Sequence, residues 1–301
     1  MVSDDGTSLA VGVYSARPSD AVALIVHGLA SHMGWYHGIA EALQEERITV
    51  YMPDRRGVAL SGGTPGHTDK WTTLVQDLLR VAEEVERRHP SRPMHAIGIS
   101  LGGVITLACS ILYPGLFASQ ILLSPALVAS VSFPPLRRME IFWQAFFNPH
   151  KLYDLPFGVK DLTDNQSWQA ALFEETKGNQ ASARFLLETL RIQRFVRKDI
   201  QHVNLPILAM FGERDLVVDN KAAIDILDKA ASPCIRVEIF ATLSHILAAS
   251  MPRQELIGRL LLWLRGNRGS AQERFALLKT LLVKHEDHVV FNPPASRTHA
   301  G

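Results

Sequence analysis

Short apolar runs alternate with longer amphipathic segments along most of this chain, and this alternation restricts the possible folds more than any other feature. The runs are rich in β-branched residues and have the length of strands buried on both faces: Ala21–Val26, Ile48–Met52, Met94–Ile99, Gln120–Ser124, Ile207–Phe211 and Arg236–Phe240. Apolar residues recur at helical spacing in Tyr36–Glu46, Thr72–Arg88, Leu101–Tyr113, Asn220–Ala231 and Ile246–Arg265. This pattern predicts an α/β protein with a doubly wound, mostly parallel sheet that binds ligands at the carboxyl ends of its strands. The segment before Ala21 is expected to add antiparallel edge strands.

Two segments interrupt the alternation and suggest the domain organisation. Residues 127–204 contain no convincing strand but several prolines and amphipathic patches, which predicts a helical insertion. After Gly266, the apolar spacing of Ala271–Lys284 predicts an amphipathic helix, and the polar residues that follow predict a mobile tail. We therefore expect a core formed by 1–126 and 205–266, a helical insertion at 127–204 and a C-terminal extension at 267–301.

Composition excludes several classes of protein. The 31 basic and 30 acidic residues leave a net charge of +1, too small a field to hold a nucleic acid. No secretory signal or apolar run of about 20 residues is found, so we expect no transmembrane segment and a cytoplasmic protein. Cys109 and Cys234 give neither a disulfide framework nor a thiolate metal set, which suits that compartment. No metal or cofactor motif is present, and the oligomeric state is left open.

The segment Gly98-Ile99-Ser100-Leu101-Gly102 links a predicted strand to a predicted helix. A G-x-S-x-G sequence in this context is typical of a nucleophile elbow, where the turn is too sharp for larger neighbours of the serine. Ser100 is therefore the candidate nucleophile. The alternative is a serine that merely caps the helix.

A serine hydroxyl needs a base and a carboxylate that orients the base, in the chain order serine, acid, histidine. Asp215 follows the strand Ile207–Phe211, and His245 lies in a short loop after Arg236–Phe240. Glu213 is a weaker candidate acid because the loop has barely left the strand. Asp219 is better interpreted as a helix cap.

The negative oxygen formed in acyl transfer needs preorganised donors. The backbone N–H groups of Leu101, directly after the candidate nucleophile, and of Leu29, after the first long strand, are the candidates. His27 is expected to hold the Leu29 loop by hydrogen bonds rather than to act as a base.

Aromatic residues of the insertion are candidates for an apolar wall above the strand ends. We assign Phe133, Phe142, Trp143 and Phe146 to substrate binding. The alternative is that they only pack the insertion onto the core.

Four blocks of the sequence resemble the α/β-hydrolase superfamily: His27–His32, Pro53–Gly57, Gly98–Gly103, and Gly212–Asp215 with His245. Within it the chain is similar to the serine aminopeptidase-like family of monoacylglycerol lipase and bacterial lysophospholipases. The resemblance implies the α/β-hydrolase fold, a Ser100–Asp215–His245 triad, an oxyanion hole at Leu29 and Leu101, and a lid at 127–204. Ala59 departs from the family pattern, which usually has glycine at that position.

These features predict a serine hydrolase that cleaves an ester or thioester with an apolar acyl group through an acyl-enzyme, like a lipase, lysophospholipase or esterase. Its partner is a small acyl ester or lipid-like molecule. An acyltransferase or an amide or peptide hydrolase would use the same residues. A binding protein on a hydrolase scaffold is an alternative of another class. Transient membrane contact through the insertion or the Phe275–Leu282 face is a further hypothesis.

Overall fold

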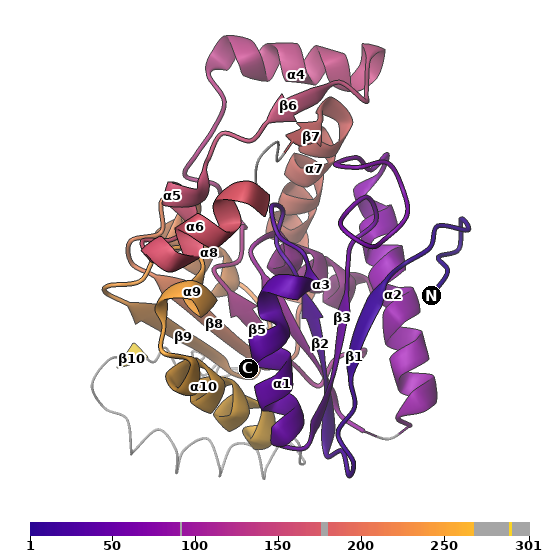
Figure 1. Cartoon of the computed structure of the whole chain (residues 1–301), viewed down its shortest axis with the longest axis vertical. Helices are drawn as coiled ribbons and strands as arrows, with labels where there is room; N and C mark the ends of the chain where they lie inside the picture. The colour runs from indigo at the N-terminus through magenta and orange to yellow at the C-terminus, as the bar shows by residue number, and fades with distance from the viewer. Residues whose placement is uncertain (91, 176–179, 268–288, 291–301) are drawn as a thin grey trace, which may run out of the picture.

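An eight-stranded sheet runs through the centre of the molecule (Figure 1). The computed structural model describes residues 1–90, 92–175, 180–267 and 289–290. The strands are β1 (Val11–Tyr14), β2 (Ala21–Val26), β3 (Ile48–Pro53), β4 (Met94–Ile99), β5 (Ser119–Leu123), β8 (Ile207–Gly212), β9 (Ile235–Phe240) and β10 (Val289–Val290). Their order is β1-β3-β2-β4-β5-β8-β9-β10. Among the described strands of this sheet, only the edge strands β1 and β10 pair antiparallel with their neighbours, which confirms the predicted mostly parallel sheet with an antiparallel strand before Ala21.

Helices cover both faces of the sheet, as a doubly wound fold requires (Figure 1). One face is covered by η1 (Met33–Tyr36), α1 (His37–Glu45), α9 (Leu247–Ser250) and α10 (Arg253–Gly266). The other is covered by α2 (Trp71–Arg88), α3 (Leu101–Leu112) and α8 (Asn220–Leu227). Successive residues of the central strands face opposite sides, so Leu24 packs in one apolar core and Ile25 in the other. This double burial explains why the strands appear in the sequence as continuous apolar runs.

One predicted helix is wrong in its continuity. The segment Ile246–Arg265 forms two helices, α9 and α10, with Met251 and Pro252 between them. Proline has no N–H to donate within a helix, and Pro252 instead precedes the first turn of α10. The apolar periodicity on the two sides of Pro252 hid this break.

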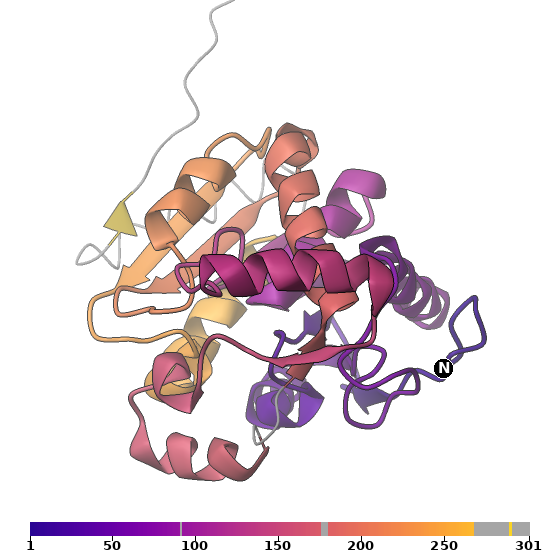
Figure 2. The same cartoon turned by 90° about the horizontal axis from the view of Figure 1, so that it is seen from above.

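The insertion between β5 and β8 is mostly helical, but it also contains two strands that the sequence did not indicate. Its elements are α4 (Pro135–Phe147), β6 (Leu152–Asp154), α5 (Val159–Leu162), α6 (Gln166–Glu175), β7 (Gln180–Ser182), α7 (Ala183–Asp199) and η2 (Ile200–His202). The strands β6 and β7 pair antiparallel with each other, and at three residues each they are too short for a periodic signal. Seen from above, α4 lies across the molecule (Figure 2).

Of the C-terminal extension 267–301, the structure describes Asn267 and β10, which pairs with β9 through Val289 and Val290. The predicted helix Ala271–Lys284 and the rest of the predicted tail lie outside the described residues. Within the described ranges, no helix combines the length and the apolar character that crossing a membrane requires.

Candidate active site

Ser100 occupies the single residue between β4 and α3, and its backbone is strained. Its φ of 52° and ψ of −116° lie in a region that costs a non-glycine residue about 1–3 kcal/mol. A Cβ at Gly98 would lie 2.5 Å from the Gly103 Cα, and one at Gly102 would overlap the carbonyl oxygen of Val26. The two glycines let β4, β2 and α3 approach closely enough to hold this turn.

The side chains of Asp215 and His245 are buried and joined by a hydrogen bond. The His245 Nδ1 lies 2.7 Å from Asp215 Oδ2, while Asp215 Oδ1 accepts the N–H groups of Val217 and Val218 at 2.8 and 2.9 Å. Both carboxylate oxygens are therefore engaged. With Nδ1–H donated to the carboxylate, the His245 Nε2 is the imidazole atom that can accept a proton. Glu213, the competing acid, is exposed.

Ser100, Asp215 and His245 all follow the carboxyl ends of parallel strands that are level with one another. Along the sheet Ile99 is opposite Leu123, Leu123 is opposite Met210, and Met210 is opposite Glu238. The N–H of Ser100 donates to the Leu123 oxygen at 2.9 Å, and the N–H of Arg214 donates to the Leu243 oxygen at 2.9 Å. The three candidate residues thus lie at the same end of the sheet, where its parallel strands have their carboxyl ends.

Asp219 accepts the N–H of Ala222 and caps α8, as predicted.

The loop after β2 is held by two buried side chains. His27 Nδ1 donates to the Gly28 oxygen at 2.9 Å, and its Nε2 accepts the N–H of Arg55 at 3.0 Å. Burial lowers the pKa of His27 well below 6.5, so the ring is neutral, and its predicted role in holding the loop is confirmed. Arg55 Nη2 donates to the oxygens of Gly28 and Leu29 at 2.8 and 2.9 Å.

The sequence predicted no role for Arg55, although it lies in the block Pro53–Gly57 that resembles the family. Its contacts orient the Leu29 N–H, a candidate oxyanion donor. The Gly28 oxygen and the Leu29 N–H belong to one trans peptide and point in opposite directions. Because Arg55 and His27 bind the oxygen, the N–H points away from them. Burial lowers the pKa of Arg55 to about 10, which still leaves the guanidinium charged at neutral pH.

A cavity of about 660 Å³ lies between the carboxyl ends of the strands and the insertion, and Ser100, Leu29 and Leu101 line it together. Of the four aromatic residues assigned to substrate binding, Phe133 and Phe142 are in the lining, but Trp143 and Phe146 are not. Trp143 is 55% exposed and Phe146 is 48% exposed, with the Arg184 guanidinium 5.5 Å from its ring. The inner face of α4 carries Arg138, Ile141 and Phe142, and the helical period turns Trp143 away from it. Phe146 lies one turn beyond Phe142, past the end of the cavity lining. The assignment is therefore reduced to Phe133 and Phe142.

The lining also includes polar residues of the insertion that were not predicted. Gln193 of α7 donates from Nε2 to the Ala126 oxygen at 2.7 Å, and the Ala126 N–H donates to the Ser100 oxygen at 3.1 Å. Arg138 of α4 and Arg197 of α7 also line the cavity. No sequence motif marks these three residues. Their contribution depends on how α4 and α7 pack over the sheet.

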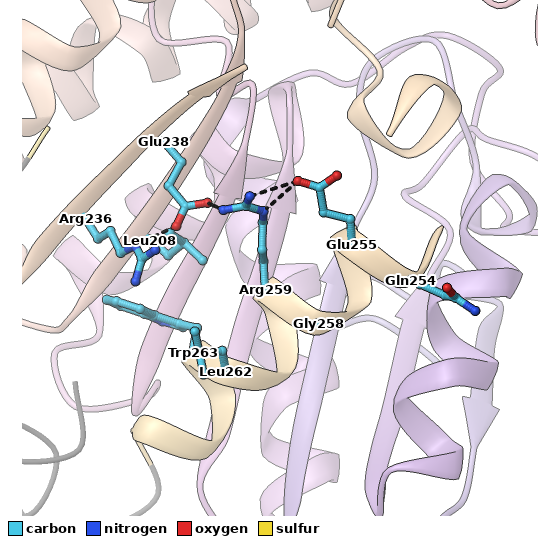
Figure 3. Close-up of a pocket in the computed structure, with 9 residues that line it drawn as sticks. All are labelled: Leu208, Arg236, Glu238, Gln254, Glu255, Gly258, Arg259, Leu262 and Trp263. Carbon is cyan, nitrogen blue, oxygen red and sulfur yellow. Dashed lines mark hydrogen bonds and ion pairs between the residues drawn. The ribbon is translucent and has the colours of Figure 1, made fainter. Parts of the chain in front are cut away.

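A second pocket, of about 260 Å³, lies between β8, β9 and α10 (Figure 3). Its lining residues Leu208 and Arg236 lie near the amino ends of their strands, at the end of the sheet opposite to Ser100. Arg259 bridges Glu238 and Glu255 at 2.7 and 2.8 Å, and Arg236 pairs with Glu238 at 2.5 Å (Figure 3). The charges in this pocket are thus matched by partners within the pocket itself.

Comparison with known proteins identifies relatives of this arrangement. The protein named "Monoacylglycerol lipase" of Mycolicibacterium smegmatis is 32% identical over 115 residues, 38% of this chain and 41% of that one. The "Monoglyceride lipase" of Rattus norvegicus is 24% identical over 237 residues, 77% of each chain. The crystal structure of Paleococcus ferrophilus monoacylglycerol lipase matches with a TM-score of 0.77 at 19% identity and covers 86% of this chain and 99% of that one.

A monoglyceride lipase structure from Saccharomyces cerevisiae matches with a TM-score of 0.78 at 17% identity, over 90% of this chain and 97% of that one. These structures show the α/β-hydrolase fold. The family model described as "Serine aminopeptidase, S33" matches residues 17–249, a span that includes Ser100, Asp215 and His245. The chain therefore belongs to the serine aminopeptidase S33 family of α/β-hydrolases, in the part that resembles monoacylglycerol lipases.

Proposed function

We propose that this protein is a serine hydrolase that cleaves a carboxylic ester with an apolar acyl group through an acyl-enzyme intermediate. One observation carries the proposal: Ser100, on a strained strand-to-helix turn, opens into the cavity that the candidate oxyanion residues Leu29 and Leu101 also line. The hydrogen-bonded residues His245 and Asp215 follow strands whose carboxyl ends lie at the same end of the sheet as that of the strand before Ser100.

In the proposed mechanism, Ser100 Oγ attacks the ester carbonyl while its proton passes to His245 Nε2. Asp215 keeps the imidazole in the required tautomer and stabilises it when it becomes positively charged. The N–H groups of Leu29 and Leu101 bind the oxyanion of the tetrahedral intermediate. His245 then gives the proton to the departing alcohol. In the second half, His245 takes a proton from a water molecule that attacks the acyl carbonyl, the bond from the acyl carbon to Ser100 Oγ breaks, and His245 returns the proton to Oγ as the acid leaves.

The lining of the cavity supports an apolar acyl group, because side chains such as Phe133, Phe142 and Leu190 surround it. The names of the relatives, monoacylglycerol and monoglyceride lipases, support an ester of a fatty acid as the substrate class. We propose that the insertion acts as the lid of this cavity, with α4 and α7 forming its upper wall.

Fluorophosphonate labelling tests the nucleophile. Wild-type protein should be labelled and should hydrolyse p-nitrophenyl esters of graded chain length, whereas Ser100→Ala should lose labelling and nearly all turnover. Ser110→Ala is a matched control, because Ser110 is a buried serine of the following helix α3. Turnover by a folded Ser100→Ala variant would refute the mechanism. Absence of labelling in folded wild-type protein would favour the binding-protein alternative.

The same residues would also serve an acyltransferase or an amide hydrolase. Partition of the trapped acyl-enzyme between water and added alcohols or amines distinguishes a transferase from a hydrolase. A matched series of ester, thioester and amide substrates identifies the leaving group.

A further inference from the structure

Two helices of the insertion each contribute a positively charged side chain to the lining of the candidate substrate cavity. Arg138 of α4 and Arg197 of α7 line the cavity. No acidic residue contributes to the lining within the described part of the chain, and most of the other lining residues are apolar. The cavity therefore combines an apolar interior with a net positive charge.

The pairing of neighbouring arginines emphasises this feature. Arg137, directly before Arg138, pairs with Glu140 at 3.1 Å, and Arg191 of α7 pairs with Glu188 at 2.6 Å. For Arg138 and Arg197, the described residues supply no acidic partner within ion-pair distance. Both are exposed, so their side chains reach solvent as well as the cavity. Arg138 and Arg197 thus line the cavity without an acidic partner among the residues that the structure describes, and they are available to attract an external anion.

Arginine binds phosphate and carboxylate groups through several N–H donors at once. We propose that Arg138 and Arg197 select esters that carry a negative charge remote from the scissile carbonyl. The inference rests on the proposed function and specifies its substrate class as an anionic amphiphile. Its apolar chain lies among the apolar lining residues, and its phosphate or carboxylate lies at the arginines.

Two matched substrate pairs test this selection and locate the charge. The first compares a medium-chain monoacylglycerol with the same compound phosphorylated on glycerol. The second compares p-nitrophenyl esters of one dicarboxylic acid, with the far carboxyl group either free or methylated. All substrates are used below their aggregation concentrations. The measured quantity is the ratio of kcat/KM for the anionic substrate to that for the neutral one.

We expect this ratio to fall about tenfold in the double variant Arg138→Gln/Arg197→Gln, mainly through KM, because a charge-assisted contact is lost. Added salt should lower the wild-type ratio by screening. Arg194→Gln is the matched control, since Arg194 is an exposed arginine of α7 that does not line the cavity, and it should keep the wild-type ratio. A response only in the first pair would place the charge on the alcohol, and one only in the second would place it on the acyl chain. An unchanged ratio in both pairs would overturn the inference.

The inference can be separated from the proposed function. If no ester is hydrolysed, the proposed function fails, and binding then becomes the readout. Decyl phosphate should raise the Tm of the wild type more than decanol does, and the double variant should lose the difference. Equal effects of the two ligands on wild-type protein would overturn the inference by this route.

Discussion

A helix packed on the sheet, α3, and a helix of the insertion, α4, are both rich in apolar residues, but they bury these residues to different degrees. In α3, which packs against one face of the sheet, every residue from Leu101 to Ser110 is buried. In α4 only Ile141 and Ala145 are buried, and the exposed apolar residues are Leu136, Met139, Phe142, Trp143, Phe146 and Phe147. An apolar helix is therefore buried only where a second layer covers it. The buried layer holds the candidate catalytic residues, and the less buried layer forms a wall of the cavity.

The insertion itself is attached unevenly. Glu188 of α7 accepts the N–H of Trp71 at 3.0 Å, and Trp71 stacks on Phe195 with ring centroids 4.7 Å apart. Ile192 of α7 also belongs to the main core of the sheet. In contrast, α4 packs on α7 through a small separate cluster that includes Ile141 and Ala183. We expect substitutions near the sheet to affect chemistry and folding, and substitutions in α4 to affect substrate preference.

The largest expected effect is on catalysis at the sheet edge. Asp215→Asn should lower kcat by about 10⁴-fold, because an amide in place of the carboxylate favours the wrong imidazole tautomer. The control Asp219→Asn should keep its activity, since asparagine caps the helix α8 as well as aspartate does. Steady-state kinetics on a p-nitrophenyl ester measures both. Near wild-type turnover by Asp215→Asn would remove Asp215 from the proposed triad.

The next effect is on stability. Gly102→Ala should lower the free energy of unfolding by more than about 3 kcal/mol or prevent folding, because its Cβ would overlap the backbone of β2. Gly258→Ala, in α10, should instead stabilise by about 0.5–1 kcal/mol, since its Cβ meets open space and alanine favours helix. Urea denaturation compares the two variants. A Gly102→Ala protein as stable as wild type would show that the elbow is less tightly packed than its geometry indicates.

The sequence predicted the sheet far better than the insertion, and the reason is physical. Strands buried on both faces need continuous apolar residues, so their pattern indicates both their place and their parallel pairing. The candidate Ser100 came from a G-x-S-x-G motif between a strand and a helix, and the candidates Asp215 and His245 came from the chain order expected after it. The lining of the cavity does not, because whether Phe142 or Trp143 faces inward depends on how α4 packs. The backbone conformation at Ala59 could not be predicted either. Its φ of 45° lies in the region that favours glycine, the residue usual at this position in the family pattern.

Acid should destabilise the folded state through three histidines whose pKa values the fold lowers. Burial lowers the pKa values of His27, His67 and His89 below 6.5. Below pH 6.5 the unfolded chain takes up protons that the folded chain binds less well, so stability present above pH 6.5 is lost as the pH falls towards the folded-state pKa values. The Tm should therefore decrease from pH 7.5 to pH 5.5. A Tm that stays level or rises over this interval would contradict the prediction.

The smallest effect concerns the wall formed by α4. Phe142 lines the cavity, whereas Phe147 is 78% exposed and does not. Phe142→Ala should shift the preferred acyl length among p-nitrophenyl esters, with changes in kcat/KM of about three- to fivefold per step, because each buried CH₂ contributes about 0.8 kcal/mol. Phe147→Ala should leave the profile of the wild type unchanged. Neither substitution should lower the Tm much, because Phe142 is 49% exposed and Phe147 is 78% exposed. If both variants shift the profile equally, α4 moves during binding and exposes a different face to the substrate. If neither does, the acyl group lies closer to α7 and the sheet than to α4.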